Sequence, residues 1–298
     1  MDRKKIKEKA NQLVLENKQQ IIRVMSIIVV INLIPSLFEG FDNTTMSMLA
    51  GIVSILCITF YHGYVVSGLK IARHNTNELT DDDAYVGIRR FKDLFSTYII
   101  KRLIEACIIG GVAIGLGILC LLILVAILDV NVFNYLSFST YQMNGLYSQG
   151  LADGFVVLLL LLVFIVVVVL VALFVEAYLF AVPYLLEKYH MTNMQAIKES
   201  YAFMKGYVKD YIFLQLSYLG WMFLVVVIDA VCTQLFSFIP GIGSVVASLI
   251  AGIVGVYLYT PQYYTSLAIF FEEIAYRRNG GTQENHTTYE QGENVYEN

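Results

Sequence analysis

Long apolar stretches alternate with shorter polar segments along the chain, and six of these stretches are long enough to cross a lipid bilayer. A transmembrane helix needs about 20 mostly apolar residues, because each residue advances the helix by about 1.5 Å. Most of the six exceed that length, so tilted or kinked helices are expected. The predicted spans cover residues 21–38, 44–69, 103–128, 154–182, 211–236 and 242–271. The pattern therefore predicts an all-α fold, a polytopic bundle of about six transmembrane helices.

The positive charges divide the predicted loops into two classes. Of the 20 Lys and Arg residues, Arg23 lies in the first turn of the first span, and the other 19 precede the first span, follow the last, or lie between spans two and three or four and five. The other three loops contain neither residue type. Short loops rich in Lys and Arg stay cytoplasmic during insertion. The sequence therefore predicts a multi-pass protein of the plasma membrane with both termini in the cytoplasm.

The composition agrees with a membrane protein and excludes an ordinary soluble domain. Hydrophobic residues make up 57% of the chain and charged residues 15%, against about 45–50% and about 25% in soluble domains. The net charge of −4 hides locally basic cytoplasmic loops, which would face anionic lipid. The four cysteines lie in predicted spans without a C-x-x-C pair. We interpret them as small apolar residues rather than disulfide partners or metal ligands.

Three amphipathic segments precede pairs of predicted spans, an arrangement that predicts a threefold parallel repeat. The second segment begins at Thr80 and the third at Thr192, each with capping-box spacing, to Asp83 and to Gln195. Their expected apolar faces are Ile6, Ala10, Leu13, Val14 and Ile21 in the first, Tyr85, Ile88, Phe91 and Phe95 in the second, and Ile197, Tyr201 and Met204 in the third. The third helix is expected to end near Gly206.

These segments allow two interpretations. In the first, the helices lie in the headgroup plane with their apolar faces in the acyl boundary, and Lys198, Lys205 and Lys209 contact lipid phosphates. In the second, they are connecting helices packed under the bundle. After residue 278 the chain is too poor in apolar residues to fold. We therefore predict a single helical membrane domain over 1–278 and a disordered cytosolic tail over 279–298.

Small residues recur at four-residue intervals in the sixth predicted span, a spacing that lets helices approach closely. They form two rows, with Ser244, Ser248 and Gly252 beside Ala247, Ala251 and Gly255. Packing within the monomer is the expected role, with a dimer seam or a substrate groove as alternatives. Pro261 in the same span cannot donate a backbone hydrogen bond, so a kink is expected there.

Three carboxylates inside predicted spans are candidate functional groups, because an ionised carboxylate far from water is costly. Glu105 lies one turn after Arg102 and is expected to pair with it. Glu176 and Asp229 have no obvious basic partner, and His62 in the second span is a candidate to join them in a proton relay or cation site. The alternative is that these polar groups are hydrogen-bonded to Tyr, Ser or Gln side chains of neighbouring spans.

Several chemistries have no sequence signature here. The chain lacks G-x-x-x-x-G-K-[ST], H-E-x-x-H and G-x-S-x-G, the motifs of phosphate loops, zinc peptidases and serine hydrolases. We therefore expect no enzymatic activity, catalytic residue, cofactor, metal or nucleic-acid partner. The expected partners are the lipid bilayer and a membrane protein.

Several short motifs resemble a known family. They are 196–200, 204–206, 216–221 and 239–243, Pro261 with Tyr263 and Tyr264, and 266–268 leading to 271–273. With these motifs the chain resembles, over nearly its whole length, the bacterial integral membrane family catalogued as domain of unknown function 975. The resemblance implies a multi-span protein, mostly of Gram-positive bacteria. That family is similar at a distance to the membrane domains of glycerophosphodiester phosphodiesterases, and it brings no catalytic residues.

Two function hypotheses follow. The first is a membrane module that recognises lipid or a membrane partner in envelope maintenance or resistance, motivated by the basic amphipathic segments. The second is a small-solute or proton-coupled transporter, motivated by Glu176, Asp229, His62 and the expected kink at Pro261.

Overall fold

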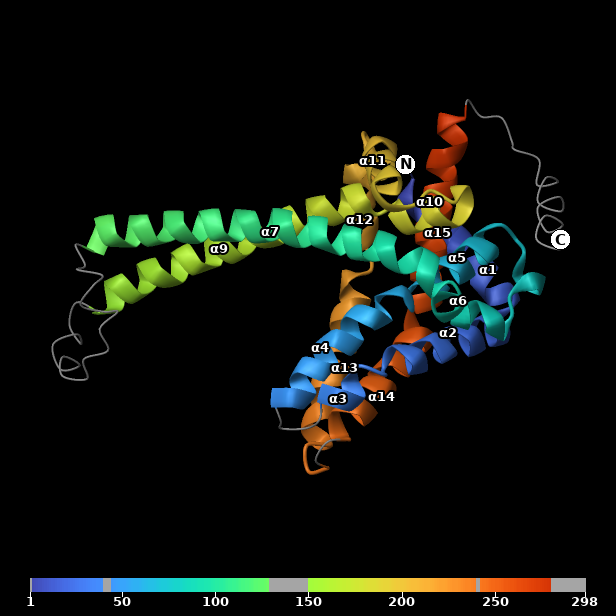
Figure 1. The fold of residues 1–298 in the computed structure, drawn as a ribbon, viewed down its shortest axis with the longest axis horizontal. Helices are drawn as coiled ribbons and strands as arrows, with labels where there is room; N and C mark the ends of the chain where they lie inside the picture. The colour runs from blue at the N-terminus through green and yellow to red at the C-terminus, as the bar shows by residue number, and fades with distance from the viewer. Residues whose placement is uncertain (1, 40–43, 129–149, 240–241, 280–298) are drawn as a thin grey trace. The chain divides into compact units, whose positions relative to one another are not determined.

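The computed structural model describes residues 2–39, 44–128, 150–239 and 242–279. Every regular element in these ranges is a helix, as the sequence pattern predicts. The chain divides into two compact units: residues 1–90 with 217–298 form unit 1, and residues 91–216 form unit 2. Figure 1 labels the helices. Except for Asn279, the predicted tail 279–298 lies outside the described residues.

Four described helices are long and apolar enough to cross a membrane, or six if each of two bent helix pairs forms one span. The four are Lys18–Phe38, Met48–Ala72, Phe91–Leu124 and Val157–Tyr189, and the pairs are Val208–Leu216 with Leu219–Leu235 and Gly243–Leu258 with Thr260–Arg278. All six overlap the predicted apolar stretches, which are thereby confirmed as helical. The break in the fifth was not expected, because neither interrupting residue, Ser217 or Tyr218, is Pro or Gly.

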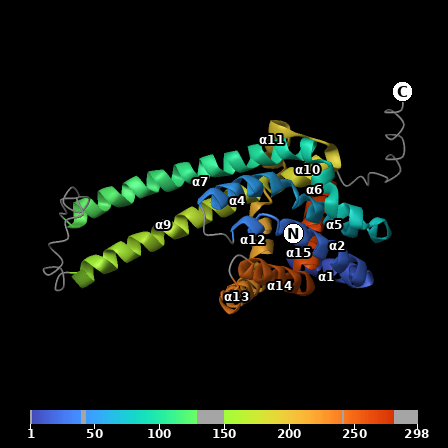
Figure 2. The same ribbon diagram turned by 60° about the horizontal axis from the view of Figure 1, so that its bottom comes forward.

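Unit 2 is built on two long helices that run side by side, α7 (Phe91–Leu128) and α9 (Gly150–Leu179) (Figures 1 and 2). Their most apolar windows are 0% buried within the chain. Ile114 and Leu162, for example, are 67% and 61% exposed. Such helices, apolar on all sides, are suited to hydrocarbon, where every backbone polar group is already hydrogen-bonded within the helix.

Three shorter helices complete unit 2: α10 (Val182–Tyr189), α11 (Asn193–Met204) and α12 (Val208–Leu216). Helix α11 covers the start of α7 and the end of α9. Its bounds confirm the third amphipathic helix, but the side chain of Thr192 makes no capping hydrogen bond. Ile197 and Met204 are buried as expected, whereas Tyr201 is 58% exposed and stacks on Tyr178 at 4.8 Å.

The amino-terminal helix α1 (Arg3–Glu16) begins at Asp2, whose Oδ1 accepts the backbone N–H of Lys4 at 3.0 Å. Helix α2 (Lys18–Asn32) follows after Asn17. The five side chains of the expected apolar face are all buried, between 0% and 7% exposed. Because α1 packs on α15 and also contacts α5, protein covers this face. This geometry favours the connecting-helix interpretation for α1.

The remaining amino-terminal elements of unit 1 are short. They are α3 (Ser36–Glu39), α4 (Thr44–Leu56), η1 (Cys57–Thr59), α5 (His62–Ala72), η2 (Thr76–Glu78), η3 (Asp81–Tyr85) and α6 (Val86–Arg89). The predicted second amphipathic helix is thus divided among η3, α6 and the start of α7. Its capping box is confirmed, since Asp83 Oδ2 accepts the Thr80 backbone N–H at 2.9 Å. Tyr85 and Ile88 are exposed, while Asp83, Ala84 and Gly87 face inward.

Three carboxyl-terminal helices complete unit 1: α13 (Leu219–Leu235), α14 (Gly243–Leu258) and α15 (Thr260–Arg278). Figure 2 shows α13 and α14 side by side, in agreement with their extensive packing. The expected kink is confirmed: α14 and α15 meet at 58°, and Pro261 stands in the first turn of α15. The row Ala247, Ala251 and Gly255 is buried. Gly252 packs closely against α2, because a Cβ built at this glycine would lie 2.5 Å from Val29 Cγ1.

Helix α5 is held on two sides. Its Lys70 Nζ contacts both carboxylate oxygens of Asp83, at 2.8 and 2.9 Å. After its last turn, Arg73 donates from Nε and Nη2 to Glu272 Oε1 of α15, at 2.8 and 2.6 Å. These pairs join α5 to η3 and to α15.

Candidate functional site

The predicted intramembrane residues occupy different parts of the fold. Glu176 is exposed on α9 of unit 2. In unit 1, His62 is fully buried at the start of α5, which packs on α15, whereas Asp229 is half-buried on α13, which packs on α14. Ser248 Oγ of α14 donates to Asp229 Oδ1 at 3.1 Å. Asp229 thus has the kind of hydrogen-bond partner that a structural role requires.

Glu105 has the partner expected from the sequence. Arg102 Nη1 lies 2.9 Å from Glu105 Oε2, and Lys101 Nζ lies 3.4 Å from Oε1. The Glu105 side chain is only 9% exposed. The two cations therefore compensate the carboxylate within α7, as a structural role of Glu105 requires.

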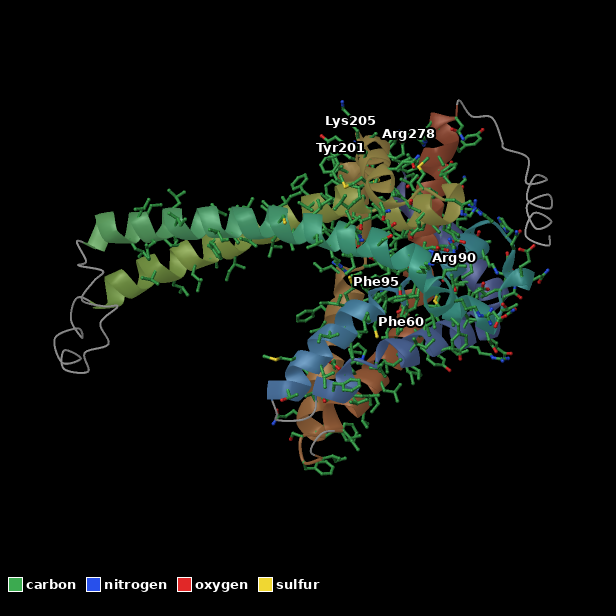
Figure 3. All side chains as sticks on the ribbon, viewed as in Figure 1. Phe60, Arg90, Phe95, Tyr201, Lys205 and Arg278 are labelled. Carbon is green, nitrogen blue, oxygen red and sulfur yellow. The ribbon has the colours of Figure 1, made fainter. Side chains whose placement is uncertain are left out.

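The three candidate headgroup lysines are exposed on neighbouring elements, with Lys198 in α11, Lys205 at its C-cap and Lys209 in α12. Lys198, Lys205 and Lys209 are all exposed, with Tyr201 between the first two. In Figure 3 the end of Lys205 points away from the other helices of unit 2, whereas the exposed Tyr201 ring stacks on Tyr178 of α9. The opposite face of α11 packs into a cluster with Leu179 and Val182. We call the four exposed residues the lysine face.

A pocket of about 320 Å³ lies in unit 1, where α13 begins and α14 meets α15. It is lined by Lys7, Glu8, Asn11, Tyr218, Trp221, Leu258, Tyr259 and Gln262. Lys7 Nζ donates to the Ser217 backbone carbonyl at 3.3 Å and lies 4.6 Å from the centre of the Tyr218 ring. The Tyr218 hydroxyl is 2.8 Å from Ser266 Oγ. We call this the bend pocket.

Tyrosine rings continue from the bend pocket into the packing between α15 and α5. Tyr218 meets Tyr263 edge-on with centroids 5.3 Å apart, and Tyr263 meets Tyr264 in the same way at 5.1 Å. Tyr264 stacks on Tyr64 of α5 at 4.5 Å. Aromatic pairs of this geometry are stabilising. They fix the position of the first turn of α15 beside the pocket.

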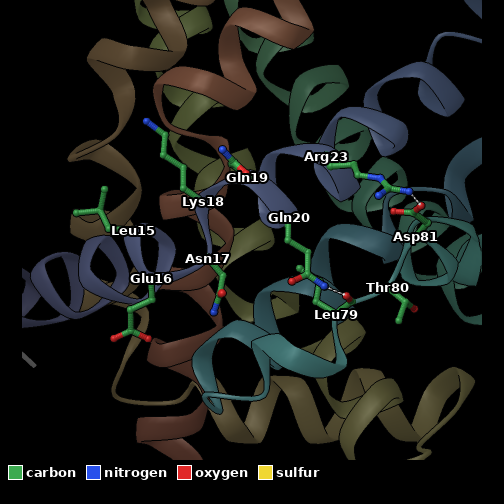
Figure 4. A pocket seen from close by; sticks show the side chains of 10 residues that line it. All are labelled: Leu15, Glu16, Asn17, Lys18, Gln19, Gln20, Arg23, Leu79, Thr80 and Asp81. Atoms are coloured by element: carbon green, nitrogen blue, oxygen red, sulfur yellow. Dashed lines mark hydrogen bonds and ion pairs between the residues drawn. The ribbon is translucent and has the colours of Figure 1, made fainter.

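A second, more polar cleft of about 770 Å³ lies at the turn between α1 and α2 (Figure 4). Within it, Arg23 pairs with Asp81 and the Gln20 side-chain amide donates to the Leu79 carbonyl. Nearby, Asn17 Nδ2 donates to Thr76 Oγ1 at 2.8 Å. Because Arg23 and Gln20 of α2 bind Asp81 and Leu79, this cleft is best explained as the joint that fixes α2 against the η2–η3 segment.

The model of the family described as "Protein of unknown function (DUF975)" matches residues 1–278. The chain belongs to this family. The match confirms the family resemblance found in the sequence. No curated protein and no solved structure matches the chain. The description of DUF975 names no activity.

Sequence reasoning missed the bend pocket of this DUF975 protein. Lys7 and Ser217 are 210 positions apart, and no local pattern joins them. One available signal was the single tryptophan of the chain, Trp221, close to Tyr218 at the start of an apolar stretch. Trp and Tyr are enriched at membrane interfaces, where a polar edge and an apolar ring are both accommodated.

Proposed function

We propose that this protein is a non-enzymatic plasma-membrane module that recognises anionic lipid at the cytoplasmic surface, in envelope maintenance or resistance to membrane-active agents. The lysine face is the observation that carries the proposal. Its three cations and Tyr201 are exposed, while the other side of α11 is covered by α7 and α9. Since α7 and α9 are apolar enough to span the membrane, α11 would lie at headgroup level, where lysines reach lipid phosphates.

The lysine face is expected to control affinity for anionic lipid. Each near-surface lysine contributes about 1 kcal/mol to binding at an anionic membrane. Reversing Lys198, Lys205 and Lys209 to Glu should therefore deplete phosphatidylglycerol among the lipids that co-purify with the full-length protein from mixed nanodiscs, measured by lipid mass spectrometry. The matched control reverses Lys4, Lys5 and Lys9, three exposed lysines of α1. Equal depletion in both variants would show that total charge, rather than the lysine face, governs the selection.

A small-solute or proton-coupled transporter is the second candidate. It is favoured by the break between α14 and α15 at Pro261, because transporters often bind substrates where spans are discontinuous. Glu176, Asp229 and His62 are its candidate coupling residues. If transport is the function, Glu176→Gln and Asp229→Asn should abolish activity while expression stays intact, whereas the lysine reversals should leave it unchanged.

The cytoplasmic location of the lysine face depends on the predicted topology. Single cysteines at positions 43 and 144 should react with an impermeant maleimide added outside the cell, and cysteines at Asn77 and Asn193 should react only after permeabilisation. The background for the test is a variant without the four native cysteines. External labelling of Asn193 would place the lysine face on the wrong side and exclude the proposed role.

A further inference from the structure

The bend pocket brings a positive charge to two helix starts. Lys7 of α1 is half-buried at the break before α13, and Tyr218 is the N-cap residue of that helix. Tyr259 ends α14 and precedes α15, so the dipoles of these two helices largely offset each other at the pocket. Glu8, the carboxylate of the lining, is exposed to solvent and its charge is screened, so the half-buried Lys7 and the first turn of α13 make the potential inside the pocket positive. That potential favours an anion in the pocket.

The pocket also contains two hydrogen-bond acceptors, one of which is buried and has no donor. Gln262 lines the pocket, and its Oε1 is buried without a hydrogen-bond partner. A buried acceptor without a partner costs about 1–3 kcal/mol, so a ligand that donates a hydrogen bond there would be favoured. The Glu8 carboxylate, also in the lining, is a second acceptor. The chemistry of the pocket thus combines one anionic group with hydroxyl donors.

The remaining wall is suited to the membrane interface. Trp221 is 45% exposed, and Leu258 contributes an apolar edge. Aromatic side chains of this kind sit at headgroup level, with the ring towards the acyl chains. The pocket lies between α1, which precedes the first span, and helices of the two bent pairs. A ligand with a polar head and an apolar body matches this setting better than a wholly soluble anion.

We propose that the bend pocket binds the headgroup of an anionic, hydroxylated phospholipid. Its phosphate diester accepts from Lys7 and lies at the start of α13, while its headgroup hydroxyls donate to Gln262 Oε1 and Glu8. The lipid tails leave the pocket along Trp221 and Leu258. This site goes beyond the lysine face, because it is in unit 1 and holds a single headgroup through defined hydrogen bonds.

Trp221 is the only tryptophan and lines the pocket, so its fluorescence reports on the site directly. The full-length protein in phosphatidylcholine nanodiscs is titrated with phosphatidylglycerol, phosphatidylethanolamine or additional phosphatidylcholine. Phosphatidylglycerol should change the Trp221 emission saturably, and the other two lipids should not. An equal response to phosphatidylethanolamine or phosphatidylcholine would overturn the proposal. Saturation by soluble glycerol 3-phosphate at the same concentration would reassign the pocket to a free phosphate ester.

Lys7→Gln should weaken the apparent affinity for phosphatidylglycerol about tenfold, the effect of losing one charge-assisted hydrogen bond. Lys9→Gln is the matched control, since Lys9 is exposed on the same helix and does not line the pocket. Lys7→Arg keeps the charge and should retain most of the response, which separates a loss of binding from a loss of folding. A wild-type response in Lys7→Gln would refute the role of Lys7.

The lysine-face variant separates this proposal from the proposed function. Reversal of Lys198, Lys205 and Lys209 should leave the saturable Trp221 response intact even where it depletes co-purified anionic lipid. Loss of the Trp221 response in that variant, with its melting temperature unchanged, would show that the bend pocket is no independent site.

Discussion

Replacing Asp83 with alanine is expected to destabilise the protein far more than replacing its neighbour Asp82. The Asp83 side chain is 8% exposed and pairs with Lys70, which is 29% exposed. Asp82 pairs with Arg89, and these side chains are 63% and 58% exposed. Removing one partner of a buried pair costs about 3–5 kcal/mol, while an exposed pair contributes about 0–1 kcal/mol. Because Lys70 is partly exposed to solvent, we expect Asp83→Ala to lower the free energy of unfolding by about 3 kcal/mol, the lower end of that range.

This difference can be measured as the apparent melting temperature of the detergent-solubilised protein. A loss of about 3 kcal/mol corresponds to a fall of roughly 6–12 °C for a protein of this size class, and the Asp82→Ala shift should stay below roughly 4 °C. Adding Lys70→Met to Asp83→Ala should cost only the exposed Lys70–Glu78 carbonyl hydrogen bond, because the ion pair is already broken. Equal shifts for the two alanine variants would contradict the assignment of Lys70–Asp83 as the stabilising pair.

Gly68→Ala is expected to separate α5 from α15. A Cβ at Gly68 would lie 2.8 Å from the Tyr264 carbonyl oxygen and 3.1 Å from its carbonyl carbon. Both atoms belong to the backbone, so no side-chain rotation relieves the clash. Overpacking of this kind costs about 1–3 kcal/mol. The helices must move apart, which also strains the Tyr64–Tyr264 stack and the Arg73–Glu272 pair.

Gly51→Ala in α4 is the matched control for helix propensity, since nothing lies within 4 Å of a Cβ built there. Alanine is favoured over glycine inside a helix by about 0.5–1 kcal/mol. We expect Gly51→Ala to keep or slightly raise the melting temperature, while Gly68→Ala lowers it. A Gly68→Ala protein as stable as the wild type would mean that α5 and α15 pack less closely than described.

The features that the sequence predicted correctly are set by local physics. The apolar stretches form helices because a long apolar segment satisfies its backbone groups internally. Pro261 bends its span since it lacks a donor. The Thr80–Asp83 capping box and the Arg102–Glu105 pair each join residues within one helical turn. Interactions of this range follow from residue spacing alone.

The features that the sequence could not supply depend on distant residues. The amphipathic pattern of α1 identified a buried face, but not whether lipid or protein covers it. The answer depends on α15, more than two hundred residues further along the chain. Likewise, the bend pocket requires the α1 lysine to reach a break in an apolar helix. The residue spacing within α1, or within the apolar stretch that contains α13, does not predict the contact between the two.

Unit 1 is formed by two stretches of the chain that are far apart in sequence and are therefore synthesised at different times. Helix α5 ends at Ala72 and α15 begins at Thr260, so 187 residues separate the two. At translation rates of about 5–20 residues per second, roughly 10–40 s pass before α15 emerges. During that interval the inward faces of α1 and α5 have no α15 to cover them. The nascent amino-terminal helices are therefore expected to depend on a membrane insertase or on surrounding lipid to shield Ile6, Leu13 and Ile71 from non-native association.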